Sequence, residues 1–201
     1  MLFNSLEFLF FLPTVFLIYW ITSSKNLKRQ NGFILLSSYI FYGWWDWRFL
    51  TLIAISTTID YFVGLKIYSC VKKNTKKYYL WISIFSNLSI LGFFKYFNFF
   101  IISWIDFLKF VGFEKYDLIT LKIILPVGIS FYTFQTMSYS IDIYLKKLKP
   151  TKDFIAFASF VSFFPQLVAG PIERAKNLLP QIQTVRSFNY MKGVEGLRLI
   201  L

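Results

Sequence analysis

The stretch Phe163-Phe-Pro-Gln-Leu-Val-Ala-Gly-Pro-Ile-Glu-Arg174 is the most informative part of the chain. Its Phe, Leu, Val and Ile side chains are too apolar for a surface loop, but two prolines and Gly170 interrupt any regular helix. In a membrane protein, irregular backbone is stable only where protein or a water-filled cavity satisfies its freed polar groups. The stretch therefore favours a lining segment in a membrane protein, and a cytosolic loop between two ordinary helices is the alternative.

A second motif, Leu125-Pro-Val-Gly-Ile-Ser-Phe-Tyr-Thr-Phe-Gln135, precedes this stretch. Because it is followed in the expected order by Pro165-Gln-Leu-Val-Ala-Gly-Pro-Ile-Glu-Arg174, the chain resembles the membrane-bound O-acyltransferase family. The bacterial branch that contains alginate O-acetyltransferase and the D-alanyl transfer protein of teichoic acid synthesis is the most similar. The resemblance covers the whole chain, since the N-terminal half of such proteins is a run of aromatic-rich spans.

The resemblance implies both a fold and an activity. The fold would be a ring of tilted helices around a thinned centre that a channel crosses. The activity would be O-acyl transfer, and specifically O-acetylation, of an extracytoplasmic polysaccharide or another hydroxyl-bearing polymer of the cell envelope. The acyl donor, acetyl-CoA or an acyl group on a carrier protein, would arrive from the cytosol as a substrate, with no bound cofactor. A secreted or membrane-anchored relay protein is a further implied partner.

A membrane transporter or a lipid-flipping subunit is the alternative function. Such proteins also build their binding sites from broken helices and polar groups inside the membrane. They usually show paired, related halves, and this chain contains no evident internal repeat. The acyltransferase interpretation is therefore favoured.

The catalytic residue of the acyltransferase family is a histidine, and this chain contains none. Ser-His-Asp and Cys-His catalytic arrangements are therefore excluded within these residues. We expect residues 1–201 to be the truncated N-terminal part of a single acyltransferase domain, inactive when alone. No residue of the chain is assigned a catalytic or metal-binding role.

The composition independently predicts an integral membrane protein. Hydrophobic residues make up 56% of the chain and charged residues only 16%, more apolar surface than one soluble core of this size can bury. The net charge of +12 resides in short basic clusters between apolar runs, so nucleic-acid binding is not expected. The single cysteine, Cys70, excludes an intrachain disulfide and a thiolate metal site.

The apolar runs predict an all-α, polytopic protein with about five spanning helices, an interfacial helix and a re-entrant segment. The spans are predicted at residues 6–22, 33–45, 49–69, 78–94 and 129–145, the second being short and the fourth ending at Lys95. Residues 97–111 have the periodicity of an amphipathic interfacial helix, with a sixth tilted span as the alternative. Residues 154–164 are too few to cross a membrane, and we expect a half-helix that Pro165 ends.

Charged residues predict the orientation of these spans. Basic clusters follow the first, third and fifth spans, whereas the tips near Asp46 and around Asp106 and Asp117 are close to neutral. The positive-inside rule places basic loops in the cytosol. The sequence therefore predicts a multi-pass protein of the cell (inner) membrane with its N-terminus outside.

Polar residues within the apolar segments are the candidate functional residues, because such groups are rare in spans. Gln135, Ser138 and Asp142 share one helix face and are expected either to line a passage or to bond between helices. Asp60, midway along the third span, needs a partner such as a tyrosine hydroxyl. Asn87-Leu-Ser89 matches a glycosylation pattern but lies in a span, so we expect no modification there.

The broken stretch supplies the remaining candidates. Its polar and turn-forming residues could surround a hydrated mouth where the donor enters, although Glu173 and Arg174 could instead pair with charges elsewhere in the protein. The full set of channel or donor-mouth candidates is Gln135, Ser138, Gln166, Gly170, Pro171, Glu173 and Arg174.

Overall fold

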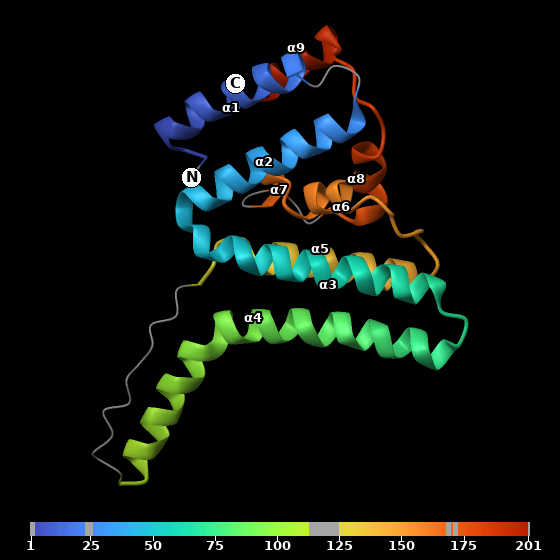
Figure 1. Ribbon diagram of the computed structural model, residues 1–201. Coiled ribbons are helices and arrows are strands. Elements are labelled where there is room, and N and C mark those ends of the chain that lie inside the picture. The colour runs from blue at the N-terminus through green and yellow to red at the C-terminus, as the bar shows by residue number, and fades with distance from the viewer. Residues whose placement is uncertain (1–2, 23–25, 113–124, 168–169, 171–172, 201) are drawn as a thin grey trace.

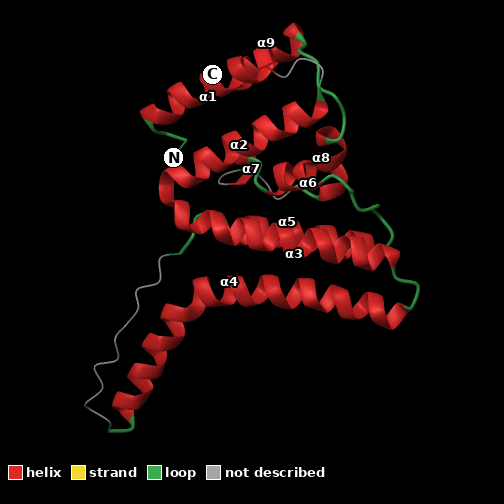
Figure 2. Cartoon of the chain, viewed as in Figure 1, coloured by secondary structure: helices red, strands yellow, loops and turns green. Residues whose placement is uncertain are grey.

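A computed structural model describes residues 3–22, 26–112, 125–167, 170 and 173–200. Every regular element among these residues is helical, which confirms the all-α prediction (Figure 2). The elements are α1 (Leu6–Thr22), α2 (Leu27–Asp46), the 3-10 helix η1 (Trp47–Phe49), α3 (Leu50–Ser69), α4 (Lys73–Phe110), α5 (Ile129–Tyr144), α6 (Phe154–Val161), α7 (Phe164–Leu167), α8 (Ala175–Ile182) and α9 (Tyr190–Ile200).

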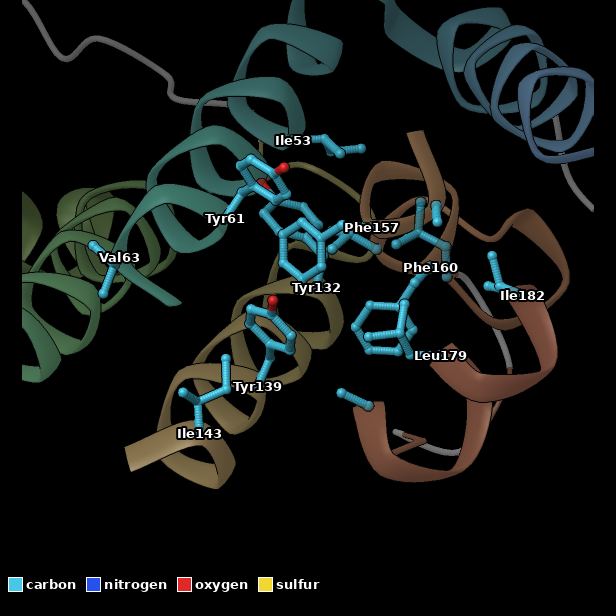
Figure 3. Close-up of a cluster of buried hydrophobic side chains, with 14 of the residues drawn as sticks. Ile53, Tyr61, Val63, Tyr132, Tyr139, Ile143, Phe157, Phe160, Leu179 and Ile182 are labelled. Atoms are coloured by element: carbon cyan, nitrogen blue, oxygen red, sulfur yellow. The ribbon is translucent and has the colours of Figure 1, made fainter. Parts of the chain in front are cut away.

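The long helices are stacked side by side, with α3 and α5 packed together between α4 and the short helix α6 (Figure 1). Helix α6 in turn packs against α2 and α8. The main hydrophobic core lies where α3, α5, α6 and α8 meet (Figure 3). At its centre, the Phe157 ring lies 4.4 Å from the Tyr139 ring and 5.9 Å from the Tyr61 ring, between centroids. Aromatic packing of this kind fixes the short helix α6 against two long helices.

Helix α2 is longer than the predicted span at 33–45. It begins at Leu27, because the Asn26 side chain accepts hydrogen bonds from the backbone N–H groups of Lys28 and Arg29. At the other end, Asp46 caps η1 through the Arg48 N–H and binds the Arg48 guanidinium at 2.6 Å. The predicted start at residue 33 was therefore wrong. Residues 27–32 are mostly polar, a composition that is typical of a loop.

Helix α4 does not end at Lys95, as the sequence predicted, but continues to Phe110, for a total length of 38 residues. Figure 1 shows that it bends midway, so that its second part leaves the helical stack as a separate arm. This arm corresponds to the predicted interfacial helix, joined without a break to the preceding span. A single lysine did not end the helix, because lysine is a good helix former and keeps its backbone N–H.

The broken stretch also differs from expectation in one detail. Helix α6 ends at Val161 before Pro165 is reached, and Pro165 instead lies in the first turn of α7. Proline is compatible with the first turn of a helix because an N–H at that position has no partner within the helix. The chain runs inward along α6 and α7 and returns through α8 to the same end of the stack (Figure 1).

The described helices leave a large apolar surface uncovered. Only 6% of the most apolar window of α4 is buried, although its mean hydropathy is 1.6. Residues 27–69 form the other stretch that is long and apolar enough to cross a membrane, and they fold as two helices, α2 and α3, that double back on each other. Residues 6–21 and 154–167 form shorter apolar helices. Apolar helices exposed to this degree are typical of a protein surrounded by lipid.

Candidate functional site

The two sequence motifs meet in space at a junction between the start of α5 and the end of α7. Gly128, just before α5, has a φ of 78°, in the left-handed region that favours glycine. A Cβ atom at this position would lie 2.7 Å from the backbone oxygen of Leu167. Residue 128 must therefore be glycine both for its backbone angle and for the close approach of the two motifs.

Helix α2 closes this junction from a third side. The Tyr42 hydroxyl donates a hydrogen bond to the backbone oxygen of Val127. The Ser38 hydroxyl accepts one from the backbone N–H of Phe164 at 3.2 Å. Side chains of α2 thus satisfy backbone groups in both irregular segments, as a buried or membrane environment requires.

The turn after α7 is equally tight. The backbone N–H of Gly170 donates to the backbone oxygen of Gln166 at 3.1 Å. A Cβ at Gly170 would lie 2.8 Å from the Gln166 Cα, so the turn excludes larger residues. Gln166 is buried here, and Pro171, another predicted site residue, lies outside the described residues.

The polar face predicted on α5 is occupied by bonds within the protein. The Gln135 side-chain amide donates to the backbone oxygen of Phe160 in α6 at 3.0 Å. The Ser138 hydroxyl donates to the backbone oxygen of Gln135 at 2.8 Å. Asp142 is buried, and its Oδ2 has no hydrogen-bond partner among the described residues. Gln135 therefore joins α5 to the broken segment at the point where α6 ends.

Glu173 and Arg174 lie at the start of α8, away from the junction. The Glu173 carboxylate accepts a hydrogen bond from the Asn177 side chain at 3.1 Å, and Arg174 occupies the N-cap position of α8. Neither residue forms an ion pair within the part of the chain that the structure describes.

A buried polar network in α3, α4 and α5 was not predicted from the sequence as a unit. The Asp60 carboxylate accepts hydrogen bonds from the Ser83 hydroxyl, from the Asn87 amide at 2.6 Å and from the Ser140 hydroxyl at 3.1 Å. Its partners are therefore two serines and an asparagine, and the expectation of a tyrosine hydroxyl was wrong. The hydroxyl of Tyr61, the next residue, instead donates a hydrogen bond to the backbone oxygen of Lys152.

The network continues beyond Asp60. The Asn87 side-chain oxygen accepts from the hydroxyls of Ser56 at 2.7 Å and Thr136 at 3.2 Å. Each of the three helices contributes two polar residues spaced four apart: Ser56 and Asp60, Ser83 and Asn87, Thr136 and Ser140. This repeated spacing within apolar helices is the signal that would have revealed the network.

Two neighbouring residues of the first motif, Tyr132 and Thr133, have buried hydroxyl oxygens without a hydrogen-bond partner among the described residues. Tyr132 is fully buried at the start of α5, and its hydroxyl has no hydrogen-bond partner among the described residues. Buried tyrosine hydroxyls usually have a partner. The hydroxyl therefore marks a position where water or a polar group of a ligand could be accommodated.

The chain is similar in sequence to several known proteins over nearly its whole length. Over 198 residues, 98% of its length, the chain is 38% identical to a probable alginate O-acetylase, AlgI, of Pseudomonas aeruginosa, and it covers 37% of that protein. It is 39% identical to the corresponding Pseudomonas putida protein and covers 40% of it. It is also 35% identical to a peptidoglycan O-acetyltransferase of Helicobacter pylori, of which it covers 42%.

The chain is thus similar, over nearly its whole length, to O-acetyltransferases of the membrane-bound O-acyltransferase type. It spans about two fifths of the length of these relatives. No protein-family model matches the chain, and no solved structure does. In this chain, the two motifs on which the resemblance rests are packing partners, in contact through Gly128 and Leu167.

Hydrogen bonds also hold the segment between α8 and α9 against the first turn of α2. The backbone of Arg186 donates to the Gln30 side chain at 3.0 Å and accepts from it at 2.7 Å. The Arg186 guanidinium binds the Asn31 side chain at 2.6 Å and lies 5.9 Å from the centroid of the Tyr19 ring. These contacts explain why the polar residues at the start of α2 are helical and buried.

Proposed function

We propose that the chain forms part of an O-acetyltransferase that modifies a polysaccharide of the cell envelope. The observation that carries the proposal is its similarity, over 98% of its length, to proteins named as alginate and peptidoglycan O-acetyltransferases. The contact between Gly128 and Leu167 supports it, because the motifs that define the resemblance form one structural unit.

In this proposal the chain builds the wall of a passage and the mouth through which the acyl donor enters. The donor, acetyl-CoA or an acyl group on a carrier protein, approaches from the cytosol, and the hydroxyl acceptor or a relay protein approaches from outside. The broken segment α6–α7–α8 supports this role because it enters the helical stack and returns to the same end (Figure 1). Gln166, Gly170 and Glu173 then lie along the re-entrant path.

The chemical step is attack of an acceptor hydroxyl on the thioester carbonyl. A base takes the hydroxyl proton as the new oxygen–carbon bond forms, and the thiol leaves with a proton after the carbon–sulfur bond breaks. Imidazole is suited to this role near neutral pH. Because the chain has no histidine, an imidazole base must come from outside these residues.

We further infer that the helices cross a membrane about five times, with the N-terminus outside. Helices α1 and α5 have 17 and 16 residues, or about 24–26 Å at 1.5 Å per residue, less than a hydrocarbon core of about 30 Å. Short spans of this kind agree with the thinned centre that the family resemblance implies. Single cysteines at Lys73 and Lys147, in a Cys70→Ser background, should react with an impermeant maleimide only in opened cells.

A cysteine at Asp46 should label in intact cells once any outer barrier is permeabilised. The opposite labelling pattern would reverse the orientation. Asp117, the other position expected to be external, lies outside the described residues.

A chimera tests the proposed function. The 198 matching residues of the Pseudomonas aeruginosa AlgI protein would be replaced by this chain, and alginate acetylation would be measured in cells lacking the native protein. We expect acetylation from the chimera and none from the chain alone. The control chimera carries Gly128→Val, which should separate the two motifs. An abundant chimera without acetylation, or a control that acetylates equally well, would contradict the proposal.

A further inference from the structure

A hollow of about 210 Å³ lies at the end of the stack where α3 ends, α4 begins and α5 ends (Figure 1). Its walls are partly apolar, and Ile67 and Ile143 in them are almost completely buried. The complete lining is Ile67, Tyr68, Lys76, Ile143, Lys146, Leu148 and Lys149. The hollow is separate from the motif junction, which lies at the other end of α5.

All the charged groups of the lining are positive. Lys76, Lys146 and Lys149 all belong to the lining of this one small space, and no carboxylate-bearing residue does. Within the described residues, none of the three forms an ion pair. The positive charge of three lysines around one hollow favours an anion as its occupant.

The backbone at Lys146 is the second indication of a ligand. Lys146 is the only described residue other than glycine with a positive φ, at 61°. It occupies the position after the C-cap of α5 where helices usually have glycine. Two backbone bonds define that ending: Lys146 N–H to Ile143 oxygen at 3.0 Å and Lys147 N–H to Asp142 oxygen at 2.8 Å. A lysine here is strained where glycine would not be, and such strain is typical of functional positions.

The start of α4 lies close to the hollow, since Lys76 of its second turn belongs to the lining. Lys72, its N-cap residue, makes no side-chain hydrogen bond to the first turn, and Lys76 lies just beyond that turn. The first N–H groups of a helix lack partners within the helix and carry partial positive charge, which favours anions. Lysine side chains and a helix N-terminus together are suited to a phosphate group.

We propose that this hollow binds a phosphate group carried on an apolar chain. The three lysines neutralise the phosphate, while Ile67, Tyr68 and Leu148 contact the adjoining hydrocarbon. The head group of an anionic membrane phospholipid and the phosphates of a coenzyme A donor share this chemistry. Only the second source would rest on the proposed acyl transfer, and the inference is tested by binding without turnover.

The test uses the purified 201-residue chain and a charge-matched pair of triple variants. The first variant replaces the lining lysines: Lys76→Met, Lys146→Met and Lys149→Met. The control replaces lysines of the same loops that lie outside the lining: Lys72→Met, Lys77→Met and Lys147→Met. Native mass spectrometry measures retained phosphatidylglycerol against phosphatidylcholine, and equilibrium dialysis measures labelled coenzyme A.

We expect the wild type and the control to bind one of the two phosphate compounds at least about tenfold more tightly than the lining variant does. Preferential retention of phosphatidylglycerol identifies a lipid site, and saturable coenzyme A binding identifies a donor site. Binding of neither compound, or equal loss in both variants, would overturn the proposal. A failed acetylation chimera would not affect these measurements, so the two proposals can fail separately.

The variant Lys146→Gly separates an effect on ligand binding from an effect on folding. Glycine relieves the positive φ, so the apparent unfolding temperature in detergent should stay equal or rise. Phosphate binding should nevertheless weaken several-fold, because one ammonium group is lost. Unchanged binding in this variant would show that Lys146 is not a ligand and would remove the proposed reason for its strain.

Discussion

The polar network of α3, α4 and α5 and the motif junction of α5, α6 and α7 solve the same problem in different ways. Both must satisfy polar groups away from water. The network does so with side chains on regular helices, centred on the Asp60 carboxylate and the Asn87 amide. The junction does so with glycines that let backbone segments approach, and with α2 side chains that bond to backbone atoms. A regular helix needs polar side chains only for specific contacts, whereas broken backbone needs partners everywhere.

Removing the centre of the network should give the largest loss of stability. Asp60→Ala leaves the Ser83, Asn87 and Ser140 donors without their acceptor. Each orphaned buried donor costs about 1–3 kcal/mol, and since such costs are not additive we expect a total of about 3 kcal/mol. Unfolding in detergent, followed by circular dichroism, measures the change.

Two controls sharpen this prediction. Asp60→Asn should lose less stability than Asp60→Ala, because serine hydroxyls can reverse and accept hydrogen bonds. Thr58→Ala on the same helix removes an exposed hydroxyl that bonds only to the Ala54 backbone oxygen, so it should change stability by less than about 0.5 kcal/mol. If Asp60→Ala behaved like Thr58→Ala, the network would not hold the three helices together.

Breaking the junction should have the next largest effect. Gly128→Val places a β-branched residue at a φ of 78° and a carbon atom 2.7 Å from the Leu167 oxygen. Strain of this kind costs about 1–3 kcal/mol, and the contact adds to it. In the AlgI chimera proposed above, the variant should lose both stability and acetylation. Gly92→Val is the matched control, because a Cβ there meets nothing within 4 Å and the residue lies in α4.

The sequence predicted the junction far better than the network, for a physical reason. Proline and glycine have backbone effects that depend only on their own chemistry, so Gly128 and Gly170 announced broken helices. The start of α5 near Ile129 was predicted from Pro126 and Gly128 and is confirmed. The bounds of α1 followed from the apolar pattern and are also confirmed. Serine and asparagine inside a span have no such fixed meaning, since their partners belong to other helices. Asn87 was therefore considered only as a glycosylation site, which its burial argues against.

Two helix boundaries, the start of α2 and the end of α6, were predicted wrongly. The start of α2 was misplaced because Gln30 and Asn31 are buried only through contacts with Arg186, which is remote in sequence. The end of α6 was misplaced because the sequence analysis took Pro165 as the residue that ends the helix. Helix α6 instead ends at Val161, and the hydroxyl of its C-cap residue Ser162 donates a hydrogen bond back to the Ala158 oxygen at 2.8 Å. Roles for Gln135, Ser138 and Gln166 in a passage stay predictions.

The turn after α7 separates stability from activity. Gly170→Leu should distort the turn, and Gln166→Leu should remove a polar group from the re-entrant path. We expect both to lower acetylation by the AlgI chimera several-fold, with smaller effects on abundance than Gly128→Val has. Activity must be normalised to the amount of protein in the membrane. Normal acetylation by both variants at normal abundance would make the segment a simple connector.

The smallest effect on stability is expected at Tyr132, where the junction keeps an unused polar atom. Its hydroxyl is buried without a partner among the described residues. Tyr132→Phe therefore removes a polar group that is costly to bury and makes no hydrogen bond there. The free energy of unfolding should stay within about 0.5 kcal/mol of the wild type or increase slightly. Tyr42→Phe is the matched control, because that hydroxyl bonds to the Val127 oxygen and its loss should destabilise the chain by about 1 kcal/mol.

Two outcomes for Tyr132→Phe have different meanings. If the variant is as stable as expected but lowers acetylation by the AlgI chimera, the hydroxyl contacts a water or substrate group. A loss of stability as large as that of Tyr42→Phe would instead show that Tyr132 has a structural partner, and that the junction leaves no polar capacity for a ligand there.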